Sequence, residues 1–377
     1  MNQICSKCIY DDSIPTISFD HLGVCSYCLQ IDDIAEKYGT GTKKGTDELG
    51  RLLDEIKSNG RKQKYDCVIG VSGGTDSSYL LMKAVEWGLS PLAVHYDNTW
   101  NSAIATMNIE KVTRTLSVDL YTHIVDNHEI DDIKASIVKA RILEFDADTD
   151  VAIIQVLRSV AAKYHISYIL EGHSFFTEGI SPVSQNYFDG RYIKDIHEKY
   201  GQLKMKTFPN LTFSRFVRWT LLHRQQIIRP LWYINYDKEI ARNELADKTG
   251  WQYYGGHHLE NRASAFFHTV WAPQGFNVDF RNLTIAAQVR SGKIARKEGF
   301  RRMEEPIEVD PSLTEFVLKR LKMSEEELDF AMNGVKQNWR DFKSYKRRFE
   351  LFRPVFLYLL KRNRVTHSFY IKYCFPI

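Results

Sequence analysis

The sequence lacks the features of membrane-spanning and of disulfide-stabilised proteins. No apolar run approaches the roughly 20 residues that a helix needs to cross a bilayer, and the first residues do not join a basic segment to an apolar one. Only six cysteines occur among 377 residues, too few for a disulfide scaffold. We find no internal repeat and no low-complexity tract. With 44% hydrophobic and 26% charged residues, we expect a globular, cytoplasmic protein.

Net positive charge is confined to one end of the sequence. Residues 345–377 contain eight basic residues and one acid, a formal +7, so that residues 1–344 carry about −3 of the overall +4. A uniformly basic nucleic-acid-binding surface is therefore not indicated, and we expect no nucleic-acid partner. We expect the basic, aromatic segment to form a helix that packs on the body. Peripheral contact with the anionic inner membrane, or docking of a partner, is the alternative.

Four of the cysteines form two Cys-x-x-Cys pairs near the start of the chain. Cys5 and Cys8 make the first pair, and Cys25 and Cys28 the second. In a reducing compartment such pairs indicate a metal, and four thiolates suit a tetrahedral Zn²⁺ site with a structural role. An iron–sulfur cluster or a redox dithiol is the alternative. We expect a zinc-binding module over residues 1–40.

From residue 65 onward, short β-rich runs alternate with helical patterns. The expected strands are 65–71, 91–96, 120–125 and 166–170, and the expected helices are 77–87, 103–116, 130–143, 151–164 and 237–250. This alternation predicts an α/β domain over residues 46–250 with a doubly wound parallel sheet. Its ligand should bind at the carboxyl ends of the strands, where the strand order reverses.

The first expected strand leads into a loop of small and hydroxyl residues. Gly73 and Gly74 lack a Cβ, so the backbone can approach an anion, and the next helix offers the N–H groups of its first turn. The stretch fits neither a Walker loop nor a dinucleotide fingerprint. An ordinary strand-turn-helix is the alternative. The candidate phosphate-binding residues are Ser72, Gly73, Gly74, Thr75, Asp76, Ser77 and Ser78.

This loop resembles the PP-loop of the ATP pyrophosphatases. Those enzymes cleave ATP to AMP and pyrophosphate and use the adenylate to activate an oxygen of a second substrate. The resemblance implies an adenine nucleotide alpha-hydrolase-like fold with ATP as a ligand. Asp76 would help to hold Mg²⁺ or would cap the loop.

Other expected strand ends add candidates. Asp97 and Asn98 would contact ribose or adenine, with a simple turn as the alternative. Gly172 and His173 follow the fourth strand; His173 would donate to phosphate or adenylate, or would be a buried histidine bonded to a carbonyl. Arg229 would stabilise negative charge as ATP splits.

Residues 251–281 are rich in aromatic residues, glycine and histidine without a clear period. We expect a loop region that covers a pocket and receives the second substrate near residues 255–261. Glu260 and His258 are the candidate general acid and base. A metal site that adds His257 and His268 is the alternative. With helices expected at 313–322 and 325–336, residues 251–377 form the last region, mostly helical at its end.

The motifs along the chain are, in order, the cysteine pairs, the loop at 72–78, Glu-Gly-His at 171–173, Arg-Pro-Leu at 229–231 and the stretch 255–262. This order of motifs resembles that of the N-acetyl sugar amidotransferases of the WbpG and PseA type. The resemblance implies an ATP-dependent amidotransferase that converts the acetamido group of an N-acetyl sugar, free or nucleotide-linked, into an acetamidino group for bacterial surface polysaccharide. It also implies ammonia from a separate glutaminase with a cyclase-like channel subunit. The sequence departs from the family pattern at His257, where a lysine is expected.

Two alternatives remain beside this interpretation. A tRNA-thiolating PP-loop enzyme also carries cysteine pairs, but it needs an active-site thiol, and neither Cys67 in the first strand nor Cys374 near the end suits that role. A zinc-ribbon adaptor that binds nucleotide only structurally is the non-catalytic alternative.

Overall fold

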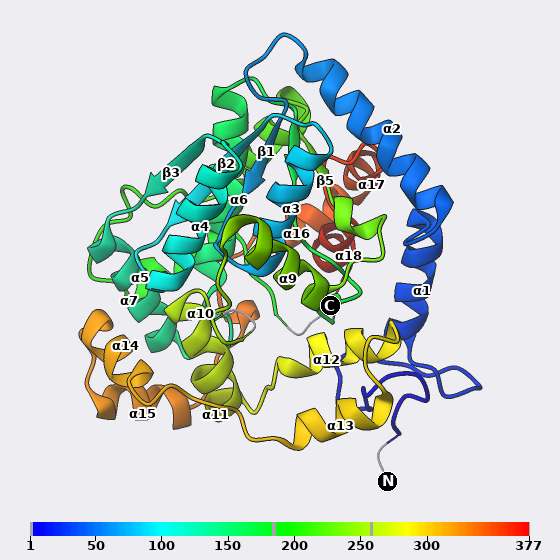
Figure 1. Cartoon of the computed structure of the whole chain (residues 1–377). Helices are drawn as coiled ribbons and strands as arrows, with labels where there is room; N and C mark the ends of the chain where they lie inside the picture. The colour runs from blue at the N-terminus through cyan, green and yellow to red at the C-terminus, as the bar shows by residue number, and fades with distance from the viewer. Residues whose placement is uncertain (1–2, 183–185, 257–258, 377) are drawn as a thin grey trace.

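A five-stranded parallel sheet forms the centre of the molecule (Figure 1). The computed structural model describes residues 3–182, 186–256 and 259–376. The strands are β1 (Cys67–Gly70), β2 (Pro91–Asp97), β3 (Leu120–Ile124), β4 (Tyr168–Leu170) and β5 (Gln226–Ile228). Their order is β3-β2-β1-β4-β5, and every pairing is parallel. The order reverses at β1, so the predicted doubly wound sheet is confirmed.

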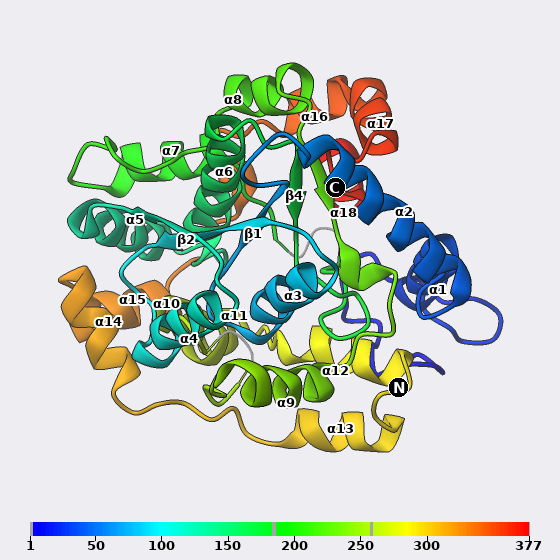
Figure 2. The same cartoon turned by 45° about the horizontal axis from the view of Figure 1, so that its top comes forward.

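Helices cover both faces of this sheet, because successive side chains of each strand point to opposite faces. Val68 of β1 packs into one core, and its neighbours Cys67 and Ile69 pack into the other. The first core lies under α5 (Asn127–Ala140), α6 (Ala147–Lys163) and α7 (Gly190–Tyr200). The second lies under α2 (Lys43–Gly60), α3 (Thr75–Glu86), α4 (Ala103–Thr115) and α9 (Lys238–Thr249). Figure 2 shows α3, α4 and α9 together on one side and α5, α6 and α7 on the other.

Local signals account for several helix boundaries. The side chain of Asp126 accepts from the first-turn N–H groups of α5, and that of Asp237 does the same for α9. Gly250 ends α9 in the left-handed conformation, with φ of 69°. Ser324 and Glu327 form a capping box at the start of α15 (Glu325–Asn333).

The prediction of a loop over residues 251–281 is wrong for its second half. That part forms α10 (Arg262–Phe266), a π-helical turn (Phe267–Trp271) and α11 (Ala272–Phe276) in direct succession. Phe266 and Trp271 are fully buried, and the indole N–H of Trp271 donates to the carbonyl of Ile142 at 3.0 Å. The insertion of a π turn shifts the apolar spacing away from 3.6, which hides the helix in the sequence.

The cysteine module packs on residues far along the chain. It precedes α1 (Ser26–Tyr38) and shares a small core with α12 (Arg281–Arg290) and α13 (Arg296–Glu304). The guanidinium of Arg296 donates to the carbonyls of Cys5 at 2.7 Å and of Cys8 at 2.9 Å. Figure 1 shows this module beside α12 and α13 at the lower right.

The basic C-terminal segment packs on the body, as we expected. After α14 (Leu313–Leu321) and α15, it forms α16 (Lys346–Leu351), α17 (Arg353–Lys361) and α18 (His367–Cys374). Phe349 and Phe356 join a buried cluster with Phe216 of α8 (Phe213–Val217). The N–H of Ile227 in the edge strand β5 donates to the carbonyl of Asn363 at 2.7 Å, so this segment also covers the sheet edge.

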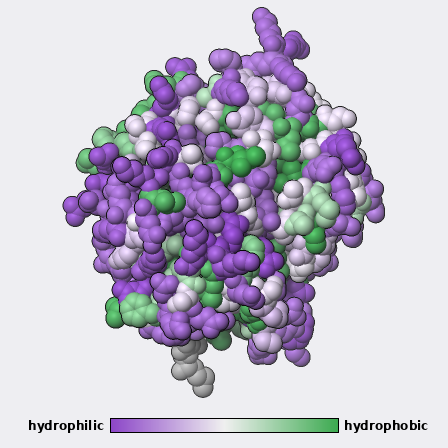
Figure 3. All heavy atoms as spheres, turned by 90° about the vertical axis from the view of Figure 1, so that its left-hand side faces the viewer, coloured by the Kyte–Doolittle hydropathy of each residue, from purple (hydrophilic) through white to green (hydrophobic). Residues whose placement is uncertain are grey.

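Among the described residues, no helix combines the length and the apolar character needed to cross a bilayer. On the face formed by the left-hand side of Figure 1, hydrophilic residues dominate and the hydrophobic ones form small separate groups (Figure 3).

Candidate functional site

The PP-loop, residues 72–78, connects β1 to α3 at the carboxyl end of the sheet. The N–H of Gly74 donates to the hydroxyl of Ser72 at 3.2 Å, and that hydroxyl lies 3.3 Å from the hydroxyl of Ser77. Gly74, the N-cap residue of α3, has no side chain to cap the helix, and the hydroxyl of Tyr254 accepts from the N–H of Thr75 in the first turn at 3.3 Å. The remaining first-turn N–H groups and the positive end of the helix dipole are therefore available to an anion.

Gly73 fits this loop because no larger residue could. Its φ is +79°, and a Cβ would lie 2.2 Å from the carbonyl oxygen of Ala105. The carbonyl of Gly73 accepts from the indole N–H of Trp251 at 2.9 Å and from the amide of Asn108 at 3.3 Å. These contacts fix the peptide that precedes the helix.

Asp76 lies in a network of three polar side chains. Tyr236 donates to one carboxylate oxygen at 2.6 Å, and the ammonium of Lys238 lies 2.7 Å from the other. Burial alone would raise the pKa of Asp76, but Lys238 and Tyr236 outweigh it and hold this pKa below its usual value. Asp76 is thus ionised and oriented at the start of α3. Lys238 is not a solvated helix residue, because its side chain is only 14% exposed.

Glu178 is the second carboxylic acid of this network. It lies 3.8 Å from Lys238. Burial and then the neighbouring Asp76 carboxylate raise the pKa of Glu178 to about 8. At neutral pH it is mostly protonated and can donate a proton or a hydrogen bond.

The end of β4 approaches the PP-loop through Gly172. A Cβ at Gly172 would lie 2.9 Å from the carbonyl oxygen of Asp76 and 3.1 Å from the nitrogen of Ser77, so only glycine allows this contact. Strand β4 and the loop are therefore in direct backbone contact, which places the residues after Gly172 beside the candidate phosphate site.

His173 follows, with both ring nitrogens engaged. Nε2 lies 3.0 Å from the carbonyl oxygen of Gly179, which requires Nε2 to carry the proton, and Nδ1 accepts from the indole N–H of Trp232 at 3.1 Å. Burial, reinforced by the guanidinium of Arg229, lowers the pKa of His173 to about 3. His173 is therefore neutral and fixed in one tautomer. This bonding favours a positioning role, and direct contact with adenylate stays a prediction.

Arg229 comes directly after β5 and joins the strand ends to the C-terminal helix. Its Nε donates to Glu171 at 2.9 Å, and one terminal nitrogen donates to the hydroxyl of Ser368 in α18 at 3.4 Å. The guanidinium also lies over the ring of Trp232, 5.0 Å from its centre. Its planar group is held at the strand end where charge would develop.

Asp97 and Asn98 shape the end of β2. Asp97 accepts from the N–H of Thr99 at 2.8 Å, which is a turn contact. Asn98 is buried, and its oxygen accepts from the N–H of Trp100 and from the amide of Asn261, each at 3.1 Å. Since this oxygen is already bonded, Asn98 acts here as a bridge within the protein, and contact with ribose or adenine stays a prediction for both residues.

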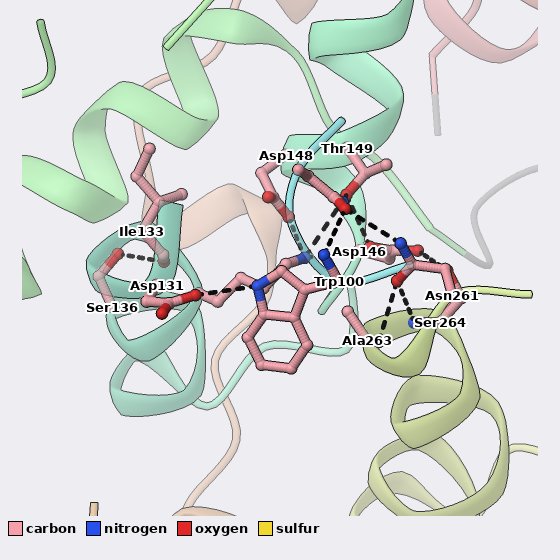
Figure 4. A network of polar contacts seen from close by, with 12 residues as sticks. Trp100, Asp131, Ile133, Ser136, Asp146, Asp148, Thr149, Asn261, Ala263 and Ser264 are labelled. Carbon is pink, nitrogen blue, oxygen red and sulfur yellow. Dashed lines mark hydrogen bonds and ion pairs between the residues drawn. The ribbon is translucent and has the colours of Figure 1, made fainter. Parts of the chain in front are cut away.

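The same network holds Glu260 in place. Asn261 caps α10 by accepting from the N–H of Ala263 at 2.9 Å (Figure 4), and the N–H of Ser102 donates to the carbonyl of Glu260 at 2.9 Å. A Cβ at Gly74 would lie 3.0 Å from a carboxylate oxygen of Glu260. The structure thus brings Glu260 to the PP-loop, across more than 180 residues of sequence.

Of the candidate histidines in residues 251–281, the structure describes only His268. His257 and His258 lie outside the described residues. His268 lies in the π-helical turn, where its ring contacts those of Phe267 and Phe280. Among the described residues, the four cysteines are the one group with three or more metal-ligating side chains close together.

A cavity of about 400 Å³ opens beside these strand ends. Glu171, His173 and Arg229 line it from β4 and β5. Helix α6 contributes Asp150 and Arg158, and the C-terminal helix α18 forms the opposite wall with residues that include Ser368, Phe369 and Lys372. Its volume suits a small organic ligand.

The four paired cysteines form a compact metal-binding group. All four are fully buried, and their sulfurs lie within 4.8 Å of one another. Cys5 and Cys28 are 3.9 Å apart, and Cys8 and Cys25 are 3.8 Å apart. Four bonds of about 2.3 Å around one tetrahedral ion place sulfurs about 3.8 Å apart, so the group fits a single ion.

Several site residues were missed in the sequence. Tyr254 accepts from the N–H of Thr75 at 3.3 Å, and Trp251 and Asn108 bond to the loop carbonyl, yet each lies on another element. Tyr236 and Glu178 were missed for the same reason. No local sequence pattern marks these residues as part of the site. The one indication in the sequence was that several of them lie close to candidate residues along the chain.

Comparison with known proteins adds a family match over part of the chain. No curated protein matches. Among solved structures, the fold is similar to the NMN synthetase from Francisella tularensis (13% identity, TM-score 0.33, 75% of this chain and 95% of that one). It is also similar to the U34-tRNA thiolase NcsA from Methanococcus maripaludis with its 4Fe–4S cluster (14% identity, TM-score 0.34, 82% and 91%). Residues 260–355 match the family described as "LPS biosynthesis protein WbpG-like, C-terminal domain". This part of the chain is therefore similar to that domain, in agreement with the resemblance seen in the sequence.

Proposed function

We propose that this protein is an ATP-dependent amidotransferase that converts the acetamido group of an N-acetyl sugar into an acetamidino group. The observation that carries the proposal is the start of α3, which follows a glycine loop without an N-cap side chain, with Asp76 and Lys238 beside it and a cavity at the adjoining strand ends. The WbpG-like match over residues 260–355 supports the choice of reaction.

The position of each residue suggests its role in the proposed reaction. The PP-loop amides would bind the phosphates of ATP, and Lys238 and Arg229 would stabilise negative charge as pyrophosphate leaves. Each oxygen of Asp76 keeps a lone pair beyond its present bond, so this carboxylate fits a Mg²⁺ ligand. Mg²⁺, when bound, would neutralise phosphate charge. Helix α18 and the aromatic cavity wall would exclude water.

The reaction balances without an enzyme nucleophile. The acetamido oxygen attacks the α-phosphorus, and pyrophosphate leaves with the electrons of the broken P–O bond. Ammonia then adds to the carbon of the O-adenylated intermediate, AMP leaves as the C–O bond breaks, and a proton is lost to solvent or to a base. Glu260, beside Gly74, is the candidate acid–base residue together with His258.

Buried cysteines argue against the alternative of tRNA thiolation. Cys67 and Cys374 are both fully buried. Burial raises the pKa of Cys67 well above its usual value and that of Cys374 to about 12, so neither is a reactive thiolate. The other four cysteines form the metal group. No cysteine therefore stands ready to carry sulfur.

For the cysteine group we propose a structural Zn²⁺ ion. The sulfur spacing fits a single ion, and backbone N–H groups of Lys7, Cys8 and Cys25 donate to the sulfur of Cys5 at 3.2 to 3.4 Å. The guanidinium of Arg290 lies 3.8 Å from the sulfur of Cys8 and offsets thiolate charge. We also propose that a separate glutaminase with a channel subunit supplies the ammonia.

The test is pyrophosphate release by the pure protein with ATP, Mg²⁺, an ammonium salt and acetamido sugars. We expect release that requires an acetamido sugar and is not supported by the corresponding sugar without the acetyl group. Release that depends on tRNA would favour the thiolation alternative. Binding of ATP without release under any condition would favour an adaptor.

A further inference from the structure

The cavity under α18 contains a cation without a matching anion. Arg158 of α6 lines this cavity and is only 2% exposed. One terminal nitrogen donates to the carbonyl of Arg364 at 3.2 Å. The other two nitrogens, Nε and Nη1, are buried and have no hydrogen-bond partner within the described ranges. A guanidinium has five N–H donors, so most of its hydrogen-bonding capacity is unused.

The groups around Arg158 do not compensate for the missing hydrogen-bond partners. The guanidinium carbon lies 5.8 Å from the ring centre of Phe216, a weak contact compared with an ion pair. Burial lowers the pKa of Arg158 to about 10, although Glu171 raises it in part, so the group stays charged at neutral pH. Burying an unpaired charge is costly, and a protein keeps such a group where a ligand completes it.

Most other charged groups of the cavity are already engaged, and burial raises the pKa of the remaining acid, Asp150, to about 7. Arg229 is paired with Glu171 at 2.9 Å. Asp189 accepts from backbone N–H groups, among them those of Arg191 at 2.8 Å and Tyr345 at 2.6 Å. Lys372 donates to the side chain of Asn186 at 2.5 Å. Among the described contacts of this cavity, the charge of Arg158 is thus the one that most clearly lacks a paired anion.

We propose that this cavity binds the acceptor sugar through an anionic group, a carboxylate or a phosphate, that pairs with Arg158. The aromatic wall, which includes Phe216 and Phe369, would contact the apolar face and the methyl group of the sugar. Arg229, which lines the cavity directly after β5, would then lie beside the acetamido group. The identity of the bound molecule as an acceptor rests on the proposed function, whereas the preference for an anion does not.

The test is equilibrium binding by calorimetry in the presence of the α,β-methylene analogue of ATP, which cannot be cleaved between these phosphates. The probes are N-acetylglucosamine, which is neutral, N-acetylmuramic acid, which carries a carboxylate, and N-acetylglucosamine 1-phosphate. We expect at least one anionic probe to bind at least about tenfold more tightly than the neutral sugar, as a charged hydrogen bond would give. The two anionic probes distinguish a carboxylate site from a phosphate site.

Substitution of Arg158 locates the effect. Arg158→Met should abolish the preference for the anionic probe while binding of the neutral sugar changes little, and Arg158→Lys should retain part of it. Arg347→Met, at an exposed arginine of α16, is the matched control and should change nothing. A purely structural arginine would instead lower the Tm and weaken all probes equally.

Two results would overturn this inference: equal affinity of the native protein for neutral and anionic probes, or a preference that survives Arg158→Met. If Arg158→Met does not fold, the comparison of probes on the native protein still decides. Binding is measured without turnover, so the two proposals can fail separately. Sugar-dependent pyrophosphate release without an anion preference would support the proposed function and reject the anion site. An anion preference without pyrophosphate release would do the reverse.

Discussion

The ammonium of Lys238 lies 2.7 Å from the carboxylate of Asp76, although 162 positions separate them in the sequence. Asp76 is in the first turn of α3, and Lys238 is in the first turn of α9. The pair joins two helices on the same face of the sheet at the point where phosphate would bind. The ion pair therefore both holds the loop in place and sets the charge beside it.

Replacing Lys238 should therefore affect nucleotide binding more than folding. Lys238→Met leaves Asp76 without its main charged partner and removes a positive charge beside the phosphates, so we expect ATP affinity to fall by about tenfold to a hundredfold. Lys248→Met, at a half-exposed lysine of the same helix, is the control. The measurement is ATP binding by calorimetry; equal affinities for both variants would contradict this role.

The raised pKa of Glu178 predicts how stability depends on pH. The folded protein holds a proton on Glu178 up to pH about 8, whereas the unfolded chain releases it near the usual value of 4.5. Between these values the folded state binds more protons, so the free energy of unfolding should fall as pH rises, by up to about 1.4 kcal/mol per pH unit. Glu178→Gln should remove this contribution.

Denaturant unfolding of both proteins at pH 5.5 and 7.5 checks the point. We expect Glu178→Gln to gain stability relative to the native protein at the higher pH, because glutamine resembles the protonated acid. Parallel pH profiles for the two proteins would show that Glu178 titrates normally.

A methyl group at Gly73 should disrupt the PP-loop. Its φ of +79° strains any other residue, and a Cβ would lie 2.2 Å from the carbonyl oxygen of Ala105. We expect Gly73→Ala to lower the free energy of unfolding by about 1–3 kcal/mol and to weaken ATP binding. Gly50→Ala in α2, where a Cβ meets nothing within 4 Å, should stabilise the protein by about 0.5–1 kcal/mol. A tolerated Gly73→Ala would mean that the loop adopts another conformation.

Metal analysis should find one zinc ion per chain. Elemental analysis of the native protein, purified without added metal, is expected to show zinc and no iron, with no visible absorption from a cluster. Cys28→Ser should lose the metal and lower the Tm, because the cysteine module packs on α12 and α13. Stoichiometric iron and acid-labile sulfide would instead establish a cluster.

The sequence predicts the sheet and the loop well because both depend on local patterns. The apolar run before Gly73 and the expected strand at 91–96 correspond closely to β1 and β2. Long-range contacts carry no such signal: nothing near Trp251 or Asn108 indicates a bond to the carbonyl of Gly73. The helical stretch after residue 262 was missed because a π turn interrupts its period.

The cavity could not be predicted for a related reason. Its walls come from α6, from the strand ends and from α18, which lie more than 200 residues apart at the extremes. The packing of the basic C-terminal segment was expected, but its place beside Arg229 follows only from the three-dimensional arrangement. Contact of this segment with an anionic membrane stays a prediction.

The most direct test of the account follows the acetamido oxygen. An N-acetyl sugar accepted in the pyrophosphate assay is labelled with oxygen-18 in its acetamido carbonyl and incubated with the protein, ATP, Mg²⁺ and ammonium. If that oxygen attacks the α-phosphorus, mass spectrometry will find the label in the phosphate of AMP. Unlabelled AMP formed together with an acetamidino sugar would contradict adenylation of the amide.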